Sequence, residues 1–124
     1  MKRKTFLLIT AIIYVPFGIA MILMPETLYG LYGFELGKAG LVLGQVVGSA
    51  ITGMGIINFV ARKDEPNSSA MMGILWGNLI YHLVDIFVVL PPTMNGLVGS
   101  LTWSFVGLHL VLAISFGYYL FKKS

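Results

Sequence analysis

The fold is decided first by residues 5–24, TFLLITAIIYVPFGIAMILM, which follow the basic start MKRK and carry no charge. An α-helix rises about 1.5 Å per residue, so a run of this length crosses the roughly 30 Å hydrocarbon layer of a bilayer. Further long apolar stretches follow at residues 40–61, 70–90 and 97–121. In hydrocarbon, a helix satisfies its own backbone polar groups. The sequence therefore predicts an all-α fold, an integral membrane antiparallel four-helix bundle.

The composition agrees with this prediction. Hydrophobic residues make up 57% of the 124 residues and charged residues 10%, whereas soluble domains are about 25% charged. A chain of this length is expected to form one four-span domain over residues 1–124, without a separate soluble domain. It contains no cysteine, which excludes disulfides and cysteine-ligated metals.

The positions of the basic residues predict the orientation. Seven of the eight lie on one side of the predicted membrane, namely Lys2, Arg3, Lys4, Arg62, Lys63, Lys122 and Lys123. Only Lys38 lies on the other side. Because lysine and arginine concentrate in cytoplasmic segments, we expect a multi-pass protein of the cell membrane with both termini in the cytoplasm. The basic residues that give the net charge of +3 then lie at the membrane boundaries, so no nucleic-acid partner is predicted.

The connections are predicted to be short. Residues 62–69, RKDEPNSS, favour a hydrophilic inner turn, and residues 91–96, PPTMNG, a tight outer turn. For residues 25–39 we expect a short interfacial helix after Pro25, followed by a glycine-rich turn. This segment either anchors the protein at the membrane surface or forms a lid over an outward-facing cavity.

Glycines within the spans predict close helix packing. Small residues at every fourth position let neighbouring backbones approach each other in lipid. This spacing occurs at Gly40, Gly44, Gly48, Gly73 and Gly77. For the second span, a dimerisation face is the alternative.

Polar residues inside the third span form the candidate site. Asn78, Tyr81, His82 and Asp85 fall within roughly 100° of arc on a helix. An ionised carboxylate at the bilayer centre costs at least about 2.5 kcal/mol. Asp85 is therefore expected to face the bundle interior, to be paired or to be protonated, and His82 is close enough to pair with it. The face is a ligand or proton site, a hydrogen-bond network that fixes helix register, or an exposed carboxylate without a role.

Other spans carry further polar candidates. Gln45 and Ser49 of the second span lie at a similar depth in the outer half of the membrane, so they are expected to share one site with the third span. Asn58 is expected to be solvated or to cap its helix. His109 in the fourth span lies opposite a small-residue stripe, and only one of these two faces can point into the core.

Two histidines on adjacent spans raise the possibility of bis-histidine haem, or of a metal held by His82, Asp85 and His109. Bulky neighbours disfavour haem, and no ligand spacing supports a metal. We therefore predict neither a cofactor nor a metal. The chain also lacks a phosphate loop, a nucleophile elbow and a zinc-protease motif, so enzymatic activity is not predicted.

The order of several short motifs resembles that of a known group. These motifs are MPETLY (24–29), LYGFEL (31–36), GQVVG (44–48), LTW (101–103) and FGYY (116–119). Over nearly its whole length the chain resembles the small bacterial and archaeal four-helix membrane proteins of the DoxX-like families. Some of these are associated with quinone-linked sulfur oxidation or with membrane redox and stress complexes, which implies an auxiliary role here. The resemblance assigns no catalytic residue.

The function predicted from these observations is that of an accessory or ligand-binding subunit of a membrane complex. Its ligand would be an apolar molecule, such as a lipid or quinone, held between helices. The alternatives are a proton-coupled small-molecule transporter that uses Asp85 and His82, and a haem- or metal-binding redox protein. Expected partners are the lipid bilayer and either further copies of the chain or a larger membrane complex.

Overall fold

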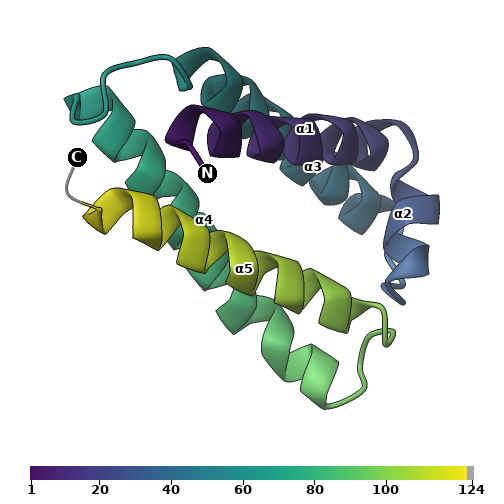
Figure 1. The fold of residues 1–124 in the computed structure, drawn as a ribbon. Helices are drawn as coiled ribbons and strands as arrows, with labels where there is room; N and C mark the ends of the chain where they lie inside the picture. The colour runs from purple at the N-terminus through teal and green to yellow at the C-terminus, as the bar shows by residue number, and fades with distance from the viewer. Residues whose placement is uncertain (123–124) are drawn as a thin grey trace. The chain divides into compact units, whose positions relative to one another are not determined.

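A computed structural model describes residues 1–122, which contain helices and no strand (Figure 1). The helices are α1 (Arg3–Leu23), α2 (Pro25–Leu31), α3 (Lys38–Ala61), α4 (Ser69–Met94) and α5 (Thr102–Phe121). The prediction of an all-helical chain is confirmed. Lys123, counted above toward the orientation, lies outside the described residues.

The chain divides into two compact units, Met1–Lys63 and Asp64–Ser124. In the N-terminal unit, α1 packs along α3, and α2 joins them (Figure 1). In the C-terminal unit, α4 packs against α5 as a helical hairpin. Each unit therefore contributes two of the long helices.

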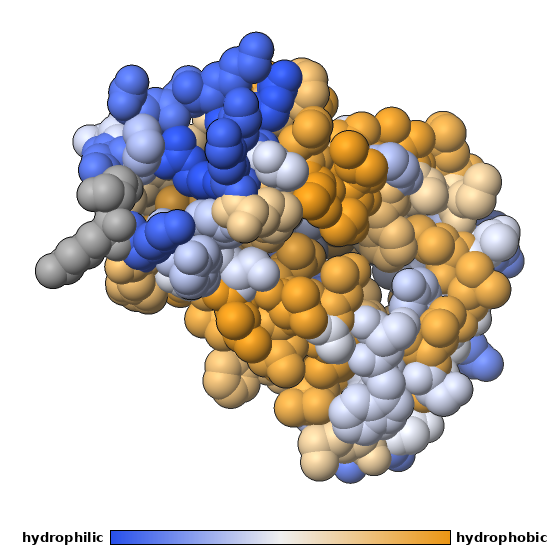
Figure 2. Space-filling view, viewed as in Figure 1, coloured by the Kyte–Doolittle hydropathy of each residue, from blue (hydrophilic) through white to orange (hydrophobic). Residues whose placement is uncertain are grey.

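Four of the helices, α1, α3, α4 and α5, are long and apolar enough to cross a membrane. They contain 21, 24, 26 and 20 residues, which correspond to about 30–39 Å of helix. Large apolar side chains point outward along them; Val60 is 67% exposed, Phe87 79% and Ile114 65%. Figure 2 shows this apolar surface, with hydrophilic residues gathered around the start of α1 and the chain that follows α3. These four helices indicate a multi-pass membrane protein.

The N-terminal unit is held by a close approach of two backbones. The buried residues of α1 include Leu7, Ala11, Tyr14, Gly18 and Met21, whose alternating spacing of four and three forms a narrow stripe. A methyl group built on Gly18 would lie 2.6 Å from the carbonyl oxygen of Gly48, and one built on Gly48 would lie 2.7 Å from that of Gly18. Each glycine thus leaves room for the backbone of the other helix, as small residues do between helices in lipid.

The short helix predicted after Pro25 is confirmed as α2. It ends where Gly33 adopts a positive φ of 75°. The amide of Phe34 then bonds the carbonyl of Tyr29, and the amide of Gly33 bonds that of Gly30, each at 3.0 Å. The rings of Tyr29 and Phe34 meet edge-to-face. This arrangement is a Schellman motif with its accompanying side-chain contact, and it stops the helix without a polar cap.

The C-terminal end of α4 differs from the prediction for the third apolar stretch. The turn expected from residue 91 is wrong, because α4 continues through Pro91 and Pro92 to Met94. The stop is Gly96, with a φ of 68°. The amide of Leu97 bonds the carbonyl of Pro92 at 2.9 Å and the amide of Gly96 bonds that of Thr93 at 3.3 Å, which makes a second Schellman motif. The predicted span 70–90 is therefore observed as residues 69–94, and the span 97–121 starts only at Thr102.

The predicted packing glycines have different surroundings. A methyl group on Gly44 would meet the ring of Tyr29 at 2.5 Å, whereas one on Gly40 would touch only Leu36, at 3.3 Å. At Gly73 and Gly77 of α4, an added methyl group meets nothing within 4 Å. Gly44 and Gly48 of α3 thus pack against α2 and α1, whereas Gly73 and Gly77 of α4 have no close neighbour.

Candidate functional site

Two histidines occupy the interface between α4 and α5. The buried stripe of α4 includes Leu75, Leu79 and His82, and that of α5 includes His109 and Leu112. His82 is 1% exposed and His109 5% exposed. Both imidazoles therefore lie at buried positions where a helix interface usually has apolar side chains. The face of α5 that carries His109 is the face that points inward.

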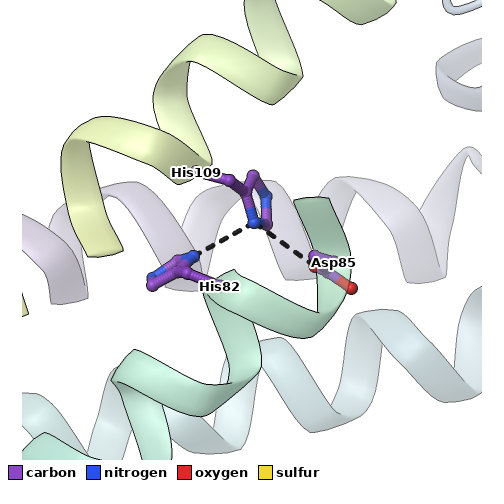
Figure 3. A network of polar contacts seen from close by, with 3 residues as sticks. All are labelled: His82, Asp85 and His109. Atoms are coloured by element: carbon purple, nitrogen blue, oxygen red, sulfur yellow. Dashed lines mark hydrogen bonds and ion pairs between the residues drawn. The ribbon is translucent and has the colours of Figure 1, made fainter. Parts of the chain in front are cut away.

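The two histidines and Asp85 form one connected polar group (Figure 3). The Nδ1 atoms of His82 and His109 lie 3.1 Å apart. The Nδ1 atom of His109 also lies 3.4 Å from Oδ2 of Asp85, whose side chain is 27% exposed. His109 is thus the central member, with a buried imidazole on one side and a partly exposed carboxylate on the other.

With Asp85 ionised, this geometry favours a single shared hydrogen at the centre of the group. A neutral imidazole carries hydrogen on one ring nitrogen, so only one of two facing Nδ1 atoms can be the donor. An ionised Asp85 carboxylate can only accept, and it therefore favours hydrogen on Nδ1 of His109. His82 then accepts at Nδ1 and carries its own hydrogen on Nε2. The hydrogen of His109 faces two acceptors, one neutral and one anionic.

Aromatic rings enclose both imidazoles. The ring of Phe105 lies 4.0 Å from that of His109 between centroids, and the ring of Phe116 stacks on His82 at 5.7 Å. Tyr81 contacts both imidazoles edge-on or tilted, and its side chain hydrogen-bonds Asp85. These rings restrict the orientation of the imidazoles, and their faces attract positive charge. The rings therefore hold the two imidazoles in fixed positions next to Asp85.

The positions of the same side chains determine whether they could ligate haem or a metal ion. The imidazole centroids of His82 and His109 are 4.8 Å apart, so a porphyrin could enter between them only if the rings separated. Within residues 1–122, no group of three histidine, cysteine or acidic side chains is arranged to hold a metal ion.

The remaining predicted site residues make contacts within their own units. Asn78 is buried, and its amide donates to the carbonyl of Ile74 at 2.9 Å. In the N-terminal unit, Nε2 of Gln45 donates to the carbonyl of Ile22 at 2.8 Å, near the end of α1. Ser49 is exposed and bonds its own helix. The structure therefore connects His82, Asp85 and His109, and a site shared with Gln45 and Ser49 stays a prediction.

Sequence reasoning missed a second buried polar contact, in the N-terminal unit. Asn58 was expected to be solvated or to cap its helix, and this is wrong, because it is fully buried at 0% exposure. Its amide donates to Oγ1 of Thr10 at 3.1 Å, and Thr10 donates to the carbonyl of Leu7 at 2.9 Å. The signal was available, since Asn58 continues the spacing of Gly48, Ile51 and Gly55 along the buried stripe of α3.

Comparison of the chain with protein-family models, curated proteins and solved structures finds no match. The function must therefore be inferred from the residues and geometry of the site.

Proposed function

We propose that this chain is a small multi-pass cell-membrane protein that binds a proton at His82, His109 and Asp85 and couples it to the movement of a small molecule. The observation that carries the proposal is the proximity of two Nδ1 atoms and one carboxylate oxygen, which lie 3.1 and 3.4 Å apart around Nδ1 of His109. Intramembrane histidine and acidic residues typically mark proton relays in pumps and transporters.

The exposed fractions of the three side chains indicate from which side a proton enters the site. Asp85 is partly exposed, whereas His82 and His109 are buried. A proton from water reaches the carboxylate first and converts it to a neutral carboxylic acid, because Nδ1 of His109 already carries a hydrogen. The protonated group is then neutral overall, which removes the cost of a charge in hydrocarbon. Loss of the proton leaves a lone carboxylate, so the two states differ in charge and favour different helix arrangements.

The proposal includes a membrane arrangement. The four long helices form an antiparallel bundle, and both termini lie in the cytoplasm. The distribution of basic residues supports this orientation. The outer ends of the spans are then the ends of α1 and α4, where residues 24–37 and 95–101 form the connections.

Charge displacement on a solid-supported membrane tests the proposal without a known substrate. Proteoliposomes of the wild type receive a step to lower pH, and proton binding is expected to give a transient current. Asp85→Asn and His109→Gln should give only the current of protein-free liposomes, because each removes a member of the proton group. Asp64→Asn, the same change outside the spans, should keep the wild-type current.

Two results would contradict the proposal. One is the absence of a transient in wild-type protein that retains its helicity. The other is a transient of equal size in wild type, Asp85→Asn and His109→Gln. Either result would return the site to the structural role of fixing helix register, and the chain to the role of an accessory subunit.

A further inference from the structure

Basic side chains gather at one end of the N-terminal unit. Because α1 and α3 run in opposite directions, the start of α1 lies beside the end of α3. This basic end consists of Lys2, Arg3, Lys4, Arg62 and Lys63. Lys38 begins α3 at the opposite end, and the 24 residues of α3 separate the two ends by about 36 Å. The basic end is visible as a hydrophilic region in Figure 2.

The guanidinium of Arg62 is held at the border between the basic end and the apolar surface. Its carbon lies 3.7 Å from the ring centroid of Phe59, over the ring face. One of its nitrogens also donates to the carbonyl of Phe59. Phe59 and Val60 are 45% and 67% exposed. A fixed positive charge therefore borders directly on exposed apolar side chains.

The other charges of the basic end point to an anionic ligand. Lys2 and Lys4 are exposed, and no ion pair links either to a carboxylate in the part of the chain that the structure describes. Asp64 and Glu65 follow Lys63 and reduce the positive charge without cancelling it. Five basic residues against two acidic ones leave a net positive surface that favours phosphate groups.

We infer that the basic end binds the phosphate headgroup of an anionic phospholipid, whose acyl chains lie along Phe59 and Val60. The contact of Arg62 with Phe59 favours a phospholipid over free phosphate, because the same site offers a cation to the headgroup and an apolar surface to the acyl chains. The inference rests on membrane insertion of the unit and is independent of the proton site. The inference goes beyond the membrane orientation of the chain, since it requires that the protein binds a lipid of a particular charge.

Native mass spectrometry from mild detergent tests the inference. The probes are phosphatidylglycerol and phosphatidylcholine with identical acyl chains, added in equal amounts. The wild type should retain more phosphatidylglycerol. Lys4→Gln should lower this preference about fivefold, and Lys4→Gln with Arg62→Gln about 25-fold, since each charge near an anionic surface contributes a factor of about five. Arg62→Lys, which keeps the charge, should keep most of the preference.

The control is Lys38→Gln, which removes one charge from the opposite end of the same unit and should change nothing. Asp85→Asn should also keep the lipid preference, so this inference and the proton proposal can fail separately. Detergent has no membrane orientation, so an effect on topology cannot produce the result. Equal retention of both lipids by the wild type, or equal loss in Lys38→Gln and Lys4→Gln, would overturn the inference. Displacement of the lipid by excess inorganic phosphate would overturn the assignment to a phospholipid.

Discussion

Replacement of Gly48 by alanine should weaken the N-terminal unit, although alanine is the better helix former. The added methyl group would lie 2.7 Å from both the carbonyl oxygen of Gly18 and Cβ of Met21. The carbonyl belongs to a helix backbone, so it cannot move away as a flexible side chain would. Overpacking of this kind costs about 1–3 kcal/mol, and the gain in helix propensity returns only about 1 kcal/mol. The expected net change is a loss of up to about 2 kcal/mol in the free energy of unfolding.

Gly53 is the matched control on the same helix. An added methyl group there meets nothing within 4 Å, so Gly53→Ala should keep or slightly raise stability. Unfolding of both variants in detergent, followed by helicity against added denaturant, should separate their free energies by about 1–3 kcal/mol. Equal stabilities would refute the close approach of α1 and α3 at Gly18 and Gly48.

Two other predictions concern Tyr29 and the connections between the long helices. Burial raises the pKa of Tyr29 above its usual 10.0, so the stabilisation from its neutral hydroxyl is complete below that value and is lost as alkaline pH passes the raised pKa. Alkaline titration of phenolate absorbance should show a late-ionising component that is smaller in Tyr29→Phe, and an unchanged curve in that variant would contradict this. In the cysteine-free chain, an impermeant thiol reagent applied from outside the cell should label Asn95→Cys and miss Asn67→Cys; the reverse pattern would refute the proposed orientation.

The long helices and the turn after α2 could be predicted because their signals are local. Length and the absence of charge defined the apolar helices, and Gly33 supplied the positive φ that ends α2. The end of α4 was misplaced because prolines are usually taken to stop a helix. The end of α4 is set by Gly96, since this residue adopts the positive φ that the Schellman motif needs.

The candidate site could be predicted only in part, because it depends on the register between two helices. The shared face of His82 and Asp85 follows from their spacing on α4. The contact of His82 with His109 does not follow, because a shift of one turn along α5 would separate them. Asn58 was misjudged for a related reason. Its position near a helix end suggested water, whereas its partner Thr10 lies 48 residues away in the chain.

The most direct test of the proton site is solution NMR of the protein in micelles, with ¹⁵N-labelled histidine. The chain has only two histidines, so each ring nitrogen can be assigned with His82→Gln and His109→Gln. The site predicts that His109 carries hydrogen on Nδ1, that Nδ1 of His82 carries none, and that a scalar coupling crosses the hydrogen bond between them. In Asp85→Asn this asymmetry should weaken, because the anionic acceptor is gone. Two histidines in the same tautomer, with no coupling between their Nδ1 atoms, would contradict the shared proton on which the proposed function depends.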